Sequence, residues 1–388
     1  MQTSGTPHLE VAVRPARACF SEILTTTRRS PALDFRVLVL GLALTAIDAS
    51  RAPAMQQQIK AEHVLTLGSE GGQGIIPGMV RSVVRDRAGQ FWITVYSSEP
   101  PIVFDAQGRF RFTVGRKGRG PGEFTGALQV LATEGDSVLV YDPGNGRINA
   151  FDPDGEFRSS RNLVSPAYWD LIVLSNGYAV VNGDVRTRQS AGFPIHVYSA
   201  DQAQPLRSFG VEVPILRPAQ PRGMLNRSLA AGSDGTFWTA AKNEYLLERW
   251  DIDGRRLARI ERRPAWFQPM IGDVDVLEGE PYAQVIDVDS DESGRLWVSA
   301  VVPEDDWEKA TTVSTDRTGR TRRRIEDYSK AYDAVIEVLD PRSGEMLAHG
   351  RFDSTMVLFL GDGYIATVLS TRDLVPVVEI WRMHLEAR

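Results

Sequence analysis

A turn that returns along the chain constrains its fold more than any other feature. Residues 86–94 read Asp-Arg-Ala-Gly-Gln-Phe-Trp-Ile-Thr, and close copies stand at residues 232–239 and 291–298. Glycine adopts the positive φ that tight turns need, and a turn of this kind between two apolar runs is typical of a β-hairpin. Six such turns predict an all-β chain, and they centre on Gly89, Gly135, Gly177, Gly235, Gly294 and Gly363.

A second kind of turn alternates with the first. It begins with an apolar residue followed by aspartate, at Asp105, Asp152, Asp251 and Asp340, and a degraded copy spans residues 198–202. The two kinds divide the chain into units of four short strands. Such units predict a six-bladed β-propeller with four-stranded antiparallel blades. We expect the aspartates to hydrogen-bond the backbone of their own turns rather than to act in catalysis.

The two kinds of turn are not equal in number. Six join first to second strands and five join third to fourth strands, so the sixth unit lacks a fourth strand. Residues 63–67, His-Val-Leu-Thr-Leu, form a strand without a partner at the other end of the pattern. We therefore predict that the N-terminal strand completes the last blade and closes the ring, which removes two exposed sheet edges.

Residues 1–54 read as a leader that contains a secretory signal. Arg36 precedes the apolar residues 37–47, and Ala52-Pro53-Ala54 has the small-x-small form of a cleavage site. This order predicts export to the periplasm or the extracellular space, with no membrane span once the signal is removed. An uncleaved anchor or a disordered tail is the alternative. Residues 55–388 are then one six-bladed propeller.

The charge of the chain bears on its partners. The formal net charge is −6, whereas phosphate binding usually shows as a basic domain, so nucleic acid is not expected as a partner. We expect a monomer.

Two segments resemble a known family. Residues 142–151, Asp-Pro-Gly-Asn-Gly-Arg-Ile-Asn-Ala-Phe, resemble the NHL repeat, and residues 118–124 resemble the Gly-Pro-Gly-Glu-Phe loop of bacterial six-bladed, NHL-like propellers. The good matches lie in the first two blades. The resemblance implies the fold but not one function, because this scaffold carries binders, lyases, lactonases and sensor domains.

Positive charge gathers on one face of the predicted propeller, which is built by the loops that lead into first strands and by the loops between second and third strands. A positive funnel there would attract an anionic small molecule, a glycan or an acidic protein surface, and an exported, non-catalytic binding or scaffold propeller is therefore our leading interpretation. A purely structural or assembly platform is a further possibility. Solvated loops that simply carry charge are the alternative. The predicted ligand-binding residues are Arg116, Lys117, Arg119, Arg186, Arg188, Arg217, Arg222, Arg227, Lys242 and Arg372. Two long insertions on this face, residues 262–283 and 303–332, are candidate recognition loops.

The alternative function is a metal-dependent lactonase-like or lyase-like enzyme with its site in the central channel. A calcium ion would need converging oxygen ligands, and the candidates are Asp170, Asn226, Asp287 and Asp289. None of the five histidines is predicted near the axis, which argues against a histidine zinc site. No catalytic residue and no cofactor is predicted, with the calcium ion as the alternative. Trp92, Trp238 and Trp297 are expected in the core between blades.

Overall fold

The computed structural model describes most of the chain beyond the leader. The described residues are 57–68, 74–97, 99–126, 129–133, 135–163, 167–184, 190–211, 213–214, 225–268, 280–315, 317, 321–370 and 375–386. The predicted leader, residues 1–54, lies outside them. Within these ranges no helix is both long and apolar enough to cross a bilayer.

Six four-stranded antiparallel sheets make up the described chain, and the predicted six-bladed β-propeller is confirmed. Blades 1 to 6 follow chain order. Their first strands are β2 (Val80–Arg85), β8 (Gln129–Ala132), β12 (Ala167–Val173), β18 (Arg227–Ala231), β22 (Gln284–Ser290) and β28 (Val357–Gly361). Their second strands are β3 (Phe91–Val95), β9 (Val138–Asp142), β13 (Ala179–Asp184), β19 (Phe237–Ala241), β23 (Leu296–Pro303) and β29 (Tyr364–Ser370).

The outer half of each blade follows the same order. The third strands are β4 (Ile102–Phe104), β10 (Arg147–Phe151), β15 (Ile195–Tyr198), β20 (Leu246–Trp250), β26 (Tyr332–Leu339) and β30 (Pro376–Glu386). The fourth strands of blades 1 to 5 are β5 (Phe110–Thr113), β11 (Phe157–Asn162), β16 (Arg207–Phe209), β21 (Arg256–Glu261) and β27 (Met346–Phe352).

The loops between the blade strands contain short strand pairs and single helical turns. The two-stranded pairs are β6 (Arg116–Lys117) with β7 (Glu123–Phe124), β14 (Ser190–Gly192) with β17 (Val213–Pro214), and β24 (Thr311–Thr315) with β25 (Thr321–Ile325). The helices in the described ranges are the single turns η1 (Ser233–Gly235), η2 (Trp307–Ala310) and α1 (Tyr328–Ala331).

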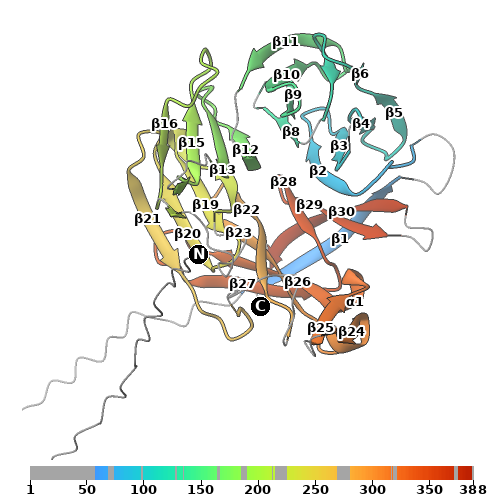
Figure 1. Cartoon of the computed structure of the whole chain (residues 1–388), viewed down its shortest axis with the longest axis vertical. Coiled ribbons are helices and arrows are strands. Elements are labelled where there is room, and N and C mark those ends of the chain that lie inside the picture. The colour runs from blue at the N-terminus through green and yellow to red at the C-terminus, as the bar shows by residue number, and fades with distance from the viewer. Residues whose placement is uncertain are drawn as a thin grey trace, which may run out of the picture. The chain divides into compact units, whose positions relative to one another are not determined.

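The first strands contact one another in an unbroken ring, from β2 through β8, β12, β18, β22 and β28 back to β2 (Figure 1). Between each pair of neighbouring blades lies one cluster of buried apolar side chains. Trp92, Trp238 and Trp297 each belong to such a cluster, as expected. The hydrophobic core is therefore divided into layers between blades, and every blade is buried on both faces.

Blade 6 takes strands from both ends of the described chain. Its order is β1-β30-β29-β28, where β1 spans Gln58–Leu67. Strand β1 pairs antiparallel with β30, from Gln58 opposite Glu386 to Leu67 opposite Val378, and the two lie side by side in Figure 1. His384 lies inside β30, because that strand continues to Glu386 along β1.

The turn aspartates hold their own loops, as predicted. Asp105 Oδ1 accepts hydrogen bonds from the backbone N–H groups of Gln107 and Arg109, both at 2.9 Å. Asp152, Asp251 and Asp340 accept equivalent bonds. These carboxylates replace missing backbone partners at the hairpins, which is a structural role.

The first-hairpin turns place an aspartate against a tryptophan. Asp86 is buried and accepts hydrogen bonds from Gln90 N at 2.8 Å, from Gln90 Nε2 at 3.0 Å and from Trp92 Nε1 at 2.9 Å. In blade 5, Trp297 Nε1 donates to Asp291 Oδ2 at 3.0 Å in the same way. The Asp-to-Trp spacing thus satisfies the indole N–H inside the core between blades.

We expect ring closure to depend on β1. A chain that begins at residue 68 leaves the long strand β30 without an outer partner, so it should lose its single cooperative thermal transition. Differential scanning calorimetry would measure this, with a chain that begins at residue 55 as the control. A full cooperative transition in the shorter chain would contradict the expectation.

Removing the Asp86 carboxylate should destabilise blade 1. Asp86→Ala leaves the Trp92 indole N–H and the Gln90 groups without their acceptor, so the free energy of unfolding should fall by about 2–4 kcal/mol. Urea denaturation would measure the loss. Asp253→Ala, at an exposed turn, is the control and should change stability by less than about 0.5 kcal/mol.

Candidate functional site

A cavity of about 450 Å³ lies where the six first strands converge, and all six strands contribute to its lining. This volume falls in the range that small-molecule sites occupy, about 300–1,000 Å³. Because the cavity is bounded by the innermost strand of every blade, it is the central channel of the propeller.

Hydrogen bonds join neighbouring first strands from blade 1 through to blade 6 at one level of the channel. Ser82, Asp170, Ser228 and Asp287 occupy equivalent positions, each opposite the fourth residue of the second strand of its blade. Ser82 Oγ donates to Val130 O at 3.4 Å, and Ser228 Oγ donates to Ile286 O at 2.7 Å. Each serine therefore joins its blade to the next one.

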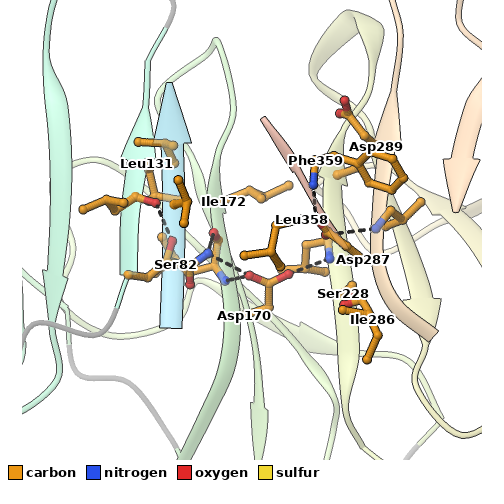
Figure 2. Close-up of a pocket in the computed structure, with 18 of the residues that line it drawn as sticks. Ser82, Leu131, Asp170, Ile172, Ser228, Ile286, Asp287, Asp289, Leu358 and Phe359 are labelled. Carbon is orange, nitrogen blue, oxygen red and sulfur yellow. Dashed lines mark hydrogen bonds between the residues drawn. The ribbon is translucent and has the colours of Figure 1, made fainter. Parts of the chain in front are cut away.

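The two aspartates make the same kind of connection as acceptors. Asp170 Oδ2 accepts from Leu229 N at 2.8 Å, and its Oδ1 accepts from Gln129 Nε2 at 2.8 Å (Figure 2). Asp287 Oδ2 accepts from Phe359 N at 2.8 Å. Of the proposed calcium ligands, Asp170, Asn226, Asp287 and Asp289 all line the channel. Asp170 and Asp287, however, use carboxylate oxygens to accept hydrogen bonds that join neighbouring blades.

The channel environment disfavours the charged form of these carboxylates. Burial raises the pKa of Asp287 well above its usual range, and the charges of Asp170 and Asp289 add to the effect. Burial also raises the pKa of Asp170, although the hydrogen bond from Gln129 and the charge of Arg81 oppose it. Burial raises the pKa of Asp289, with help from Asp291 and Asp362. Among the described residues no group of three or more His, Cys, Asp or Glu side chains is arranged to hold a metal ion.

The other end of the channel, where the first strands begin, is cationic. We call Arg81, Arg227 and Lys242 the cationic mouth, and all three line the cavity. Arg81 starts from blade 1 and donates a hydrogen bond to Trp169 O of blade 3. Its guanidinium also lies 5.5 Å from the centre of the Tyr96 ring. Arg81 therefore extends across the opening rather than outward.

Lys242 directly follows β19 of blade 4, and two backbone hydrogen bonds fix its main chain. Its N–H donates to Asn226 O at 3.0 Å, and its carbonyl accepts from Val285 N at 2.9 Å. In the part of the chain that the structure describes, no hydrogen bond or ion pair holds its ammonium. Burial lowers the pKa of Lys242, and the charge of Arg81 lowers it further. Blades 1 and 4 stand opposite one another, so this repulsion acts across the channel.

Arg227 begins β18 beside Lys242. Its backbone N–H donates to Asn182 Oδ1 at 2.8 Å, and its guanidinium donates to Asn226 O at 3.0 Å. Burial lowers the pKa of Arg227, whereas the charges of Glu244 and Glu248 raise it. The arginine therefore remains a cation that is held within the mouth.

Exposed aromatic side chains stand beside these cations. Tyr96 and Trp169 both line the cavity and remain 55% and 41% exposed. Exposed rings beside cations can hold a flat apolar group next to an anionic one.

The remaining predicted ligand-binding residues do not line this channel or lie outside the described residues. Arg116 pairs with Glu123 at 2.7 Å, Lys117 pairs with Glu99 at 2.6 Å, and Arg119 is exposed on the same loop. Such exposed pairs contribute little energy and screen the positive charge of the loop. The predicted residues outside the described ranges are Arg186, Arg188, Arg217, Arg222 and Arg372.

The Arg116 loop has a structural explanation. Asn145 Nδ2 donates to Gly118 O at 3.1 Å and Arg147 donates to Glu123 O at 2.8 Å. Gly120 N donates to Glu123 Oε2 at 2.7 Å. The Asp-x-x-Asn-x-Arg segment thus clamps the Gly-Pro-Gly-Glu-Phe loop, so the two motifs that carry the family resemblance form one local unit.

The first insertion is partly core rather than a free recognition loop. Phe267 is 4% exposed, and Phe267 and Trp266 pack on Tyr245, with ring centres 5.5 and 5.8 Å from it. In the second insertion, Arg323 lies 4.8 Å from the Trp307 ring and 3.7 Å from Glu308. The basic run there is partly neutralised within its own hairpin.

Sequence reasoning missed Arg81, Tyr96 and Trp169. Arg81 and Trp169 stand at irregular positions of their strands, where the pairing register shifts between Val80 and Ser82 and between Tyr168 and Asp170. Such bulges re-aim a side chain. The available signal was the equivalent position in blade 4, Arg227, which immediately precedes the inter-blade serine as Arg81 precedes Ser82.

Comparisons with known proteins support the fold. A protein-family model described as a 6-bladed beta-propeller (DUF5128) matches residues 92–177. The solved structure of a DUF4221 family member from Bacteroides vulgatus is similar, with a TM-score of 0.59 and 10% identity, covering 86% of this chain and 100% of that chain. Virginiamycin B lyase from Staphylococcus aureus gives a TM-score of 0.44 and 11% identity, covering 83% and 99%. No curated protein matches. These structural likenesses concern the fold alone.

The Asp287 carboxyl should make stability depend on pH. Because its folded pKa is raised, its contribution to stability is fully present below the unfolded value of about 3.9 and is lost as pH rises toward the folded value. Asp287→Asn should flatten the fall in stability above pH 4, by up to about 1.4 kcal/mol per pH unit. Urea denaturation from pH 4 to pH 8 would test this.

The control for that experiment is Asp305→Asn, because the Asp305 side chain is 96% exposed. This variant should keep the wild-type pH profile. Parallel profiles for Asp287→Asn and wild type would show that Asp287 ionises in the folded protein as it does in the unfolded chain.

Proposed function

We propose that this protein is a non-catalytic binding propeller that takes an anionic ligand, or an acidic side chain of a partner, into the cationic mouth of its central channel. The observation that carries the proposal is the group of three cations, Arg81, Arg227 and Lys242, around one end of a 450 Å³ cavity. One of the three, Lys242, is held by no counter-charge within the described chain.

Electrostatics favours an anion at this end. Lys242 and Arg81 repel one another across the opening, and burial disfavours the charge of Lys242 and of Arg227. An anion seated between them would relieve both costs, and the low dielectric of a partly buried site would strengthen its attraction. The neighbouring carboxylate, Asp170, is already engaged by Gln129 and by the backbone of Leu229.

The aromatic side chains at the opening of the channel suggest that the ligand also has an apolar part. Tyr96 and Trp169 expose ring surface at the same opening. An anion with a flat apolar body would contact both the cations and the rings, so we infer higher affinity for an aromatic anion than for an inorganic one.

We also propose that the protein is exported. The basic, apolar and small-residue order before residue 55 supports export, so the ligand would be met in the periplasm or outside the cell.

Calorimetric titration with 2-naphthalenesulfonate, citrate and inorganic phosphate tests the proposal. We expect 2-naphthalenesulfonate to bind most tightly, and raising the salt concentration from 20 to 500 mM to weaken its binding about tenfold. Lys242→Gln should weaken binding about tenfold, whereas Lys242→Arg, which keeps the charge, should not.

The matched control is Lys60→Gln, because Lys60 lies on the outer strand β1, away from the channel. That variant should bind as wild type does. No binding of any of the three anions at 20 mM salt, or equal loss in the Lys60 and Lys242 variants, would overturn the proposal.

A further inference from the structure

We propose that Lys242 is a reactive amine, and that the channel captures carbonyl-bearing anions by forming a reversible imine with it. The proposal rests on the proposed function for the charge of the ligand but not for the reactivity of the amine. It adds a covalent step to a site that otherwise only binds.

The place of Lys242 supports this role. Its side chain lines the channel cavity, and its own N–H and C=O are both fixed, to Asn226 and to Val285 of the next blade. Its stem therefore starts from a rigid point between blades 4 and 5. A nucleophile that is held at a cavity wall meets a bound ligand in a limited range of geometries.

The surroundings of the amine make its charged form less favourable than it is in water. No carboxylate pairs with Lys242 in the described residues, and Arg81 faces it across the channel. Burial and this neighbouring cation lower its pKa, which raises the fraction of unprotonated amine at neutral pH. Desolvation beside another cation is a recognised means of activating a lysine.

Three of the other four lysines are held by carboxylates. The chain has five lysines and 39 arginines. Lys117, Lys309 and Lys330 form exposed ion pairs with Glu99, Asp306 and Asp327 at 2.6, 2.5 and 2.8 Å. The hydrogen bond and the charge of Asp327 raise the pKa of Lys330. Where the chain needs only a cation it mostly uses arginine, which cannot be deprotonated, whereas the channel contains a lysine, which can.

The chemistry needs no further reagent. The Nζ lone pair adds to the carbonyl carbon, a proton moves from nitrogen to oxygen, and the resulting carbinolamine loses water to give the imine. Hydrolysis reverses each step. Arg81 and Arg227 would hold the anionic group of the ligand, and Tyr96 and Trp169 would contact its ring. The ligand class is therefore an aldehyde or ketone that carries an acidic group and a flat body.

The experiment is reductive labelling of the full folded chain followed by peptide mapping. With formaldehyde and cyanoborohydride at pH 7, a neutral probe, Lys242 should be methylated at least about tenfold faster than Lys309 and Lys330. With pyridoxal 5′-phosphate, an anionic aldehyde, the preference should increase further, and 500 mM salt should reduce only this increase.

Two variants complete the test. Lys242→Arg should remove the fast-labelled site, because a guanidinium does not form the imine. Lys60→Arg should leave labelling of Lys242 unchanged. Methylation of Lys242 by formaldehyde no faster than that of Lys309 would overturn the proposal, whatever the anions do. Fast methylation without any anion binding would uphold the reactive amine and overturn the proposed binding function.

Discussion

The hydrogen bonds that join neighbouring first strands from blade 1 through to blade 6 are the constraint on which the rest of this structure depends. In an ordinary sheet the backbone ladder holds neighbouring strands, but first strands of different blades pack with side chains between them. Ser82, Asp170, Ser228 and Asp287 therefore supply polar links at one level of the channel. These links hold neighbouring first strands together along the wall of the channel.

This constraint explains the polarity of the channel. Asp170 and Asp287 each accept a hydrogen bond from the backbone of the next blade with Oδ2, so their presence near the axis does not by itself indicate a metal site. Burial disfavours the charge of both carboxyl groups. Lys242, which no carboxylate pairs with in the described residues, is the cation that a ligand can use.

The sequence predicted the fold well because a repeat shows itself many times. Each blade has a turn glycine and apolar runs, and four blades also have the aspartate turn; the absence of that turn from the sixth unit predicted that residues 63–67 complete it. The candidate site was predicted less well. Arg227 and Lys242 were predicted because their loops are rich in charge. Arg81 and Trp169 owe their orientation to shifts of register, for which the sequence offers only the place of Arg81 directly before Ser82. Arg116 and Lys117 were predicted as ligand-binding residues on the same grounds, but in the structure they form ion pairs with Glu123 and Glu99.

Position rather than charge therefore separates Lys242 from the other basic residues. A surface ion pair keeps a lysine protonated and partly screened, and it can do so on any loop. A lysine that lies at a narrow opening, faces an arginine and is held by no carboxylate in the described chain is less easily kept charged. It gains stability either by binding an anion or by giving up its proton. These two outcomes are coupled, because an anion that binds raises the proton affinity of the amine. A ligand that carries both an acidic group and a carbonyl would use Arg81 and Arg227 for the first and leave the Lys242 lone pair for the second.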